Sequence, residues 1–193
     1  MFDRSSYFIR EHVGMLKLTD TYDILDPDSQ EQIGIAKEEP GGMIVALRFL
    51  VNKQMLPTRV NVYEGSEATG VPKFSIKRGF TLFRSRVDIL DSEGNGLGWL
   101  KSKALSLGGA FRVFDSTDNE VALVKGDWKG WNFRFLAGET EIGSVTKKWS
   151  GVGKELFTSA DNYIVTLNGD PSPQKSVLLL AAGLAVDTVY GER

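Results

Sequence analysis

Residues 177–189, which read VLLLAAGLAVDTV, lie near the end of the 193-residue chain and decide its fold. The uncharged run between Lys175 and Asp187 is 11 residues long. A membrane-spanning helix needs about 20 apolar residues, whereas a run of roughly 10–14 is more typical of a buried core helix. Asp187 would also cost about 2.5–3.5 kcal/mol at the middle of a membrane. The segment is therefore predicted to be a buried helix and not a membrane span.

The ends of this helix carry the expected signals. Ser172 suits the N-cap, Pro173 suits the first helical position, and Gly191 suits the position just past the end. Between these signals the apolar run leaves no polar face, so the helix must be surrounded on every side. In a chain built mainly of strands, a closed β-barrel would provide that surround.

Short apolar runs separated by Asp, Gly, Asn and Ser clusters dominate the rest of the chain, as antiparallel hairpins require. One arrangement recurs four times: an apolar pair, a turn residue, a polar turn, a second apolar segment and a Lys. The turn residue and the Lys are 11 positions apart in the first copy and 10 in the other three. The copies run from Ile24 to Lys37, Ile89 to Lys101, Val113 to Lys125 and Phe135 to Lys147.

Further strands are predicted at residues 7–10, 15–18, 58–63, 74–76, 80–83 and 131–135. Ten or more strands of this length need closure or a second sheet to protect their edges. No Pro-rich or Ser-rich linker divides the chain, so residues 1–193 are expected to form a single domain.

Residues 43–56 break the strand pattern. Apolar residues fall on one helical face at spacings of three and four, namely Ile44, Leu47, Leu50 and Val51. Two glycines precede the segment and Pro57 stops it, so a short helix is predicted. A pair of strands is the alternative, because the same apolar residues are good strand formers.

Composition excludes several kinds of site. The chain has no cysteine, which rules out disulfides, thiolate nucleophiles and cysteine metal sites. Its only histidine, His12, has no nucleophile motif beside it, so neither a catalytic triad nor a multi-histidine metal centre is expected. The net charge of −2 lacks the basic excess of a nucleic-acid-binding protein. No catalytic residue is predicted, and the chain is expected not to be an enzyme.

Four stretches resemble the phospholipid scramblase family: KKWSG at residues 147–151, ELFT at 155–158, ADNY at 160–163 and VDTVYGE at 186–192. The hairpin copies and the residues from Arg84 to Ile89 resemble the same group. That group includes the plant LURP-one-related proteins and shares its fold with the tubby C-terminal domain. The resemblance implies a closed barrel of about twelve antiparallel strands wrapped around a hydrophobic C-terminal helix.

The resemblance also implies a calcium segment before the final helix, which aligns with residues 159–170. Asp161 and Asp170 are the carboxylates there, but the first acidic position of the motif is Ser159. Calcium requires six to eight oxygen ligands, so two carboxylates make a weak site. The alternative is an Asx turn at Asp161 that needs no metal. No other cofactor is expected.

Basic residues are dense around the second hairpin copy: Lys77, Arg78, Arg84, Arg86, Lys101 and Lys103. On adjacent strands they would form a patch for anionic lipid head groups, each exposed charge adding roughly 1 kcal/mol at an anionic surface. Tubby domains bind phosphoinositides, so the resemblance implies a ligand of this kind. The alternative is a solvated strand face balanced by nearby Asp and Glu, which the overall acidity favours.

These features predict a scramblase-like, LURP-one-related barrel domain that binds anionic lipid head groups or a partner protein. One alternative is phospholipid scrambling between membrane leaflets, linked to calcium, and another is an enzyme with an unrecognised pocket. The first six residues lack the apolar run of a secretory signal, so the cytoplasm is the expected location, with peripheral attachment to membranes.

Overall fold

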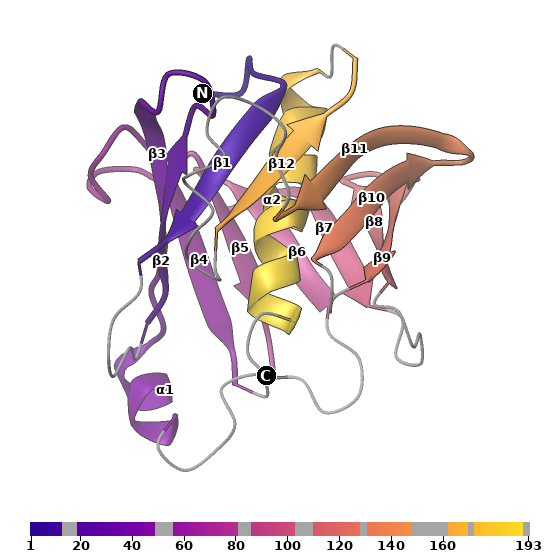
Figure 1. Ribbon diagram of the computed structural model, residues 1–193. Coiled ribbons are helices and arrows are strands. Elements are labelled where there is room, and N and C mark those ends of the chain that lie inside the picture. Colours follow the sequence, from indigo (N-terminus) through magenta and orange to yellow (C-terminus); the bar gives the residue numbers. More distant parts are fainter. Residues whose placement is uncertain are drawn as a thin grey trace.

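A computed structural model describes residues 1–12, 19–48, 56–80, 86–102, 110–127, 131–147, 162–169 and 172–190, with side chains for all but 102, 127 and 187–190. Twelve strands in these ranges form a closed barrel in which β1 pairs with both β2 and β12 (Figure 1). Every neighbouring pair is antiparallel. The predicted barrel is therefore confirmed.

The strands are β1 (Ser6–Glu11), β2 (Thr21–Leu25), β3 (Gln32–Glu38), β4 (Thr58–Glu64), β5 (Phe74–Arg78), β6 (Arg86–Asp91), β7 (Gly96–Ser102), β8 (Ala110–Asp115), β9 (Glu120–Asp127), β10 (Asn132–Ala137), β11 (Thr140–Thr146) and β12 (Tyr163–Leu167). The helices are α1 (Gly42–Leu47) and α2 (Pro173–Tyr190).

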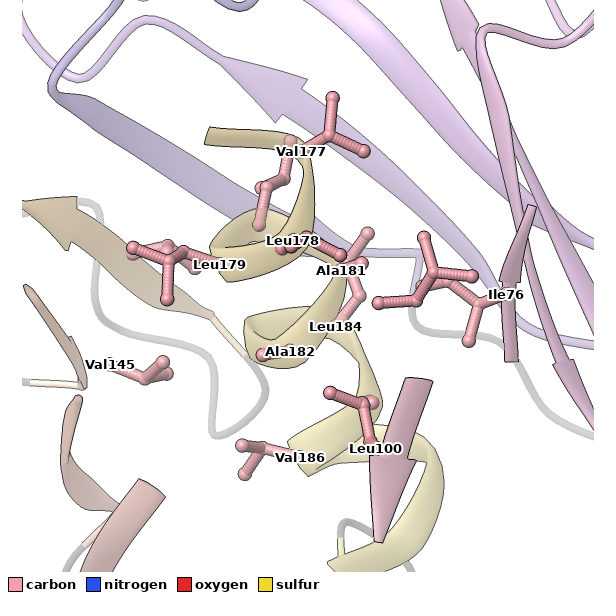
Figure 2. Packing of buried hydrophobic residues seen from close by; sticks show 14 of the residues in the cluster. Ile76, Leu100, Val145, Val177, Leu178, Leu179, Ala181, Ala182, Leu184 and Val186 are labelled. Atoms are coloured by element: carbon pink, nitrogen blue, oxygen red, sulfur yellow. The ribbon is translucent and has the colours of Figure 1, made fainter. Parts of the chain in front are cut away.

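Helix α2 runs through the centre of the barrel (Figure 1). Its apolar side chains between Val177 and Val186 are at most 7% exposed. Ile76 of β5, Leu100 of β7 and Val145 of β11 face it from different sides of the barrel (Figure 2). Burying each large apolar side chain stabilises the fold by roughly 1.5–3 kcal/mol, so α2 is a major part of the core. Within the described ranges, no helix has the length and apolarity that crossing a membrane requires.

The four copies of the sequence repeat form the hairpins β2–β3, β6–β7, β8–β9 and β10–β11. Each hairpin has a shift of register at the same place, just before the turn residue. The shifts fall between Ile24 and Leu25, Ile89 and Leu90, Val113 and Phe114, and Phe135 and Leu136. Such bulges bend a strand and increase its twist, which helps to close a barrel.

A small residue pairs with the position before each bulge. It is Gly34, Gly98 or Gly143 in three hairpins and Ala122 in the fourth. A Cβ atom on Gly98 would lie 2.3 Å from the Phe114 carbonyl oxygen and 2.7 Å from Leu178 Cδ2. The glycine therefore allows the neighbouring strand and α2 to approach β7 closely.

The turn aspartates of the first three hairpins hold the turns with their carboxylates. In each of Asp26, Asp91 and Asp115, Oδ1 accepts a bond of 2.9–3.0 Å from the backbone N–H two residues later. Hydrogen bonds lower the pKa of all three carboxyls. The first cause is the Ser29 backbone N–H for Asp26, the Asn95 side chain for Asp91 and the Thr117 hydroxyl for Asp115.

Helix α1 confirms a short helix in the segment predicted at residues 43–56, of which residues 49–55 lie outside the described ranges. Arg48, just past its end, forms a bidentate ion pair with Glu38 of β3, with Nη1–Oε2 at 2.9 Å and Nη2–Oε1 at 2.5 Å. Both side chains are at most 4% exposed. This buried pair attaches α1 to the end of the barrel.

The strands predicted at residues 7–10, 58–63 and 74–76 are confirmed, and the one at 131–135 starts at Asn132. The strand predicted at residues 15–18 lies outside the described ranges. Of the strand predicted at residues 80–83, only Phe80 is described, and it belongs to no strand. That side chain is 70% exposed, just beyond the end of β5.

Candidate functional site: the outer face of β5 to β8

Three of the six predicted head-group residues lie on the outer face of adjacent strands. Lys77 of β5, Arg86 of β6 and Lys101 of β7 are exposed there. Arg78 lies elsewhere, because successive side chains of a strand point to opposite faces. It is 4% exposed and donates from Nη2 to the Leu56 carbonyl oxygen at 3.4 Å. Arg84 and Lys103 lie outside the described residues.

Strand register places three cations side by side. Arg86 is opposite Lys101, and Lys101 is opposite Arg112 of β8, so the three span three adjacent strands. Directly opposed residues on one face have Cβ atoms about 4.5–5.5 Å apart, and like charges in that arrangement destabilise a sheet. Arg86, Lys101 and Arg112 are called the cation row below.

Acidic neighbours compensate only the ends of the cation row. Arg86 Nε donates to Asp88 Oδ1 at 2.7 Å, and Arg112 Nε lies 3.5 Å from Glu120 Oε2. Lys101, in the middle, has no acidic side chain within ion-pair distance among the described residues. The centre of the row therefore presents uncompensated positive charge to solvent.

Trp99 fixes the position of Arg86. The Arg86 guanidinium lies 4.3 Å from the centre of the Trp99 ring, in the geometry of a cation–π contact. Trp99 also stacks on Phe114. The ring centres are 4.1 Å apart and the ring planes form an angle of 10°. The indole N–H donates to Asp118 Oδ1 at 2.7 Å. Held by these contacts, Trp99 orients one end of the cation row.

A groove of about 490 Å³ adjoins the cation row. Two basic residues line it, Lys77 and Arg86 of the row, together with Trp99 and residues of the hairpins β6–β7 and β8–β9. The described lining residues are Lys77, Arg86, Asp88, Leu90, Gly94, Gly96, Gly98, Trp99, Asp115, Ser116 and Asp118. Gly94 and Gly96 leave space there, because no atom lies within 4 Å of a Cβ at either position. The groove is open and polar, which suits a solvated head group better than an apolar ligand.

Sequence reasoning missed Arg112 and Trp99 as parts of this surface. Arg112 lies 11 residues beyond Lys101, and only the pairing of β7 with β8 places the two side by side. The alternation of inward and outward side chains along a strand could have identified it. In the third hairpin copy, Arg112 alternates with Phe111 and Val113, which face the core.

The two predicted calcium ligands, Asp161 and Asp170, lie outside the described residues, so the calcium site stays a prediction. Over the part of the chain that is described, no group of three or more His, Asp or Glu side chains is placed to hold a metal ion.

His12 belongs to a polar cluster around Asp23 of β2. Its Nε2 is 2.7 Å from Asp23 Oδ1, and Asp23 Oδ2 accepts a bond of 2.7 Å from Arg10 Nη2. Gln32 Nε2 also donates to Asp23 Oδ1, at 3.1 Å. The Asp23 side chain is 8% exposed, so these donors satisfy a largely buried carboxylate and join the first three strands.

The closed antiparallel barrel with an apolar C-terminal helix inside it defines the class of protein. The model of the Scramblase family matches residues 59–193, and the chain belongs to that family. Phospholipid scramblase 1 of Mus musculus and that of Rattus norvegicus are each 30% identical over 63 residues. The match covers 33% of this chain and 19% of each relative. No solved structure matches the chain.

Proposed function

We propose that this domain is a non-enzymatic module that binds anionic phospholipid head groups at a membrane surface through the cation row. One observation carries the proposal: Arg86, Lys101 and Arg112 stand opposite one another on three adjacent strands. Such an arrangement costs stability in the free protein. A phosphate placed over the row would relieve that repulsion, and arginine binds phosphate with two parallel hydrogen bonds.

Local charge has to account for this binding, because the chain as a whole carries a net charge of −2. Each Lys or Arg close to an anionic membrane contributes roughly 1 kcal/mol. Phe80 adds an apolar contact near the same end of the barrel. It follows the end of β5, whose last residue, Arg78, pairs with Val87 beside Arg86. An exposed aromatic beside cations suits a membrane interface.

The proposal includes peripheral attachment to a membrane from the cytoplasm. A protein partner with an acidic surface would use the same cations, and the vesicle experiment below separates the two. Calcium bound by Asp161 and Asp170 would contribute separately to membrane binding. Adding a calcium chelator to the vesicle assay tests that contribution.

Phospholipid scrambling is the second candidate, because the chain belongs to the Scramblase family. Insertion of α2 into a bilayer would remove the apolar side chains from Val177 to Val186 from the barrel core. Fluorescent lipid in vesicles reconstituted with the protein, with and without calcium, tests this candidate. Lipid exchange between leaflets at the rate of protein-free vesicles would contradict it.

The test of the main proposal is co-sedimentation with vesicles of phosphatidylcholine containing phosphatidylserine or a phosphoinositide, at low and high salt. Two doubly substituted variants are compared. Lys101→Gln with Arg112→Gln removes two charges of the cation row. Lys37→Gln with Lys73→Gln removes two exposed charges away from the row, one on β3 and one just before β5, and serves as the matched control.

The wild type and the control are expected to sediment with anionic vesicles and not with pure phosphatidylcholine. Loss of two surface charges from the row is expected to weaken binding by about tenfold or more. Equal binding by the two variants would contradict the role of the row. If the wild type bound no anionic vesicle at low salt, the lipid proposal would be overturned. A protein partner with an acidic surface would then remain as the candidate ligand of the row.

A further inference from the structure

A second hollow lies where α2 begins, between the first turns of that helix and β9 to β11. Its volume is about 170 Å³. Of the described residues, five apolar and two polar ones line it: Val121, Ala137, Ile142, Leu178, Leu179, Asn168 and Lys175. They come from β9, β10, β11, the residue just after β12 and the first turns of α2 (Figure 1).

The position of α2 explains this hollow. The helix packs most closely against β12 and, on the opposite wall, against β5 to β8, whereas β9 to β11 lie less close to it. On the side of β9 to β11, the hairpin β10–β11 curves away from α2 (Figure 1). Its turn also begins with Ala137, where the other three hairpin copies have Asp. A small side chain at that position leaves the mouth of the hollow open.

The polar groups of the hollow lie at its edge. Lys175 is exposed, and among the described residues no carboxylate lies within ion-pair distance of it. Asn168 Nδ2 donates to the Glu141 carbonyl oxygen at 3.1 Å, which fixes the amide at the rim. Leu178 and Leu179, at most 3% exposed, form the apolar wall. The lining therefore combines an apolar interior with a single positive charge.

We infer that this hollow binds a small monocarboxylate with an apolar tail, of the size of a medium-chain fatty acid. The carboxylate would pair with the Lys175 ammonium, and the tail would lie against Leu178, Leu179 and Ile142. An apolar cavity of about 150 Å³ is large enough for benzene, so 170 Å³ suits roughly six to ten non-hydrogen atoms. The lining accounts for both parts of the ligand. The positive charge at the rim complements the carboxylate, and the apolar interior accommodates the tail.

The experiment is calorimetric titration of the full chain, without vesicles, with octanoate, octanol and acetate. Octanoate is expected to bind at one site, octanol more weakly because it lacks the charge, and acetate not measurably because it lacks the tail. Lys175→Gln should reduce octanoate affinity by about tenfold or more and abolish its advantage over octanol. Ala137→Leu, which fills the mouth, should weaken octanoate and octanol alike.

Lys37→Gln is the control for loss of a surface charge and should bind octanoate like the wild type. Absence of octanoate binding to the wild type overturns the inference. Unchanged octanoate binding by both Lys175→Gln and Ala137→Leu also overturns it, since the ligand would then be bound elsewhere. Since Lys175 is exposed, its replacement leaves the core intact, and thermal unfolding of each variant verifies this.

Discussion

The inner and outer faces of β7 are built from different kinds of residue. Gly98 and Leu100 point inward, against α2, where adding or removing a single methyl group would change the packing. Trp99 and Lys101, their neighbours in sequence, point outward beside Arg86 and Arg112. The residue types on the inner face are explained by the core that they form. The outer row of cations has no such explanation, because repulsion within it opposes folding.

This difference shows where function can be sought in the fold. At positions that contact α2, the residue type is constrained by the shape and apolarity of the core, so it is explained by stability. Outer residues of the same strands are free of that constraint, so an energetically unfavourable arrangement among them needs another explanation, which under the proposed function is a bound ligand. Four variants, one of them doubly substituted, compare the core, the hairpin turns and the outer face.

The largest effect is expected inside the barrel. Leu180→Ala removes a side chain that is 0% exposed, and large-to-small changes of this kind cost about 2–5 kcal/mol. The free energy of unfolding, measured by urea titration, should fall by that amount. Met43→Ala, at a side chain that is 80% exposed on α1, is the control and should change little. Equal effects of the two changes would show that α2 is not the core.

Gly98→Ala should have the next largest effect. The added Cβ would meet the Phe114 carbonyl oxygen at 2.3 Å, and overpacking of this kind costs about 1–3 kcal/mol. Gly96→Ala is the matched control two residues away, because no atom lies within 4 Å of a Cβ there. Chemical denaturation of both variants measures the difference. A Gly98→Ala protein as stable as Gly96→Ala would contradict the close approach of β7 and β8.

The turn aspartates provide a smaller, pH-dependent effect. Their pKa values are lowered in the folded chain below the ordinary 3.8, so their contribution to stability is full above pH 4. It is lost as pH falls through the folded-state pKa values, because protonation breaks the bonds that the carboxylates accept. Asn cannot titrate, so Asp91→Asn with Asp115→Asn should flatten the dependence of the urea midpoint on pH below about 4. An unchanged slope would contradict the lowered pKa values.

The smallest effect is expected on the outer face. Lys101→Gln removes the central charge of the cation row and should raise the free energy of unfolding by a few tenths of a kcal/mol at low salt. The gain should shrink in about 1 M salt, where screening acts within roughly 3 Å. Lys37→Gln, on β3, provides the comparison. A loss of stability in Lys101→Gln alone would mean that the row serves folding and not a ligand.

Local sequence signals determined much of this protein. The length of the apolar run and its lack of a polar face predicted a buried helix at residues 177–189, and turn chemistry predicted the four hairpins. Both rest on interactions between residues near one another in the chain. The same signals placed Lys77, Arg86 and Lys101 near one another, because β6 and β7 form one hairpin and β5 precedes them.

Only the tertiary structure decided how these pieces combine. It separated Lys77 from Arg78, because side-chain alternation turns the second inward, and it added Arg112 through the register of β7 with β8. It also placed α2 closer to β12 and to β5 to β8 than to β9 to β11, which leaves the hollow beside Lys175. Register and packing depend on contacts between residues distant in sequence. Composition and spacing along the chain therefore determined that a helix would be enclosed, whereas long-range pairing decided which side chains meet around it.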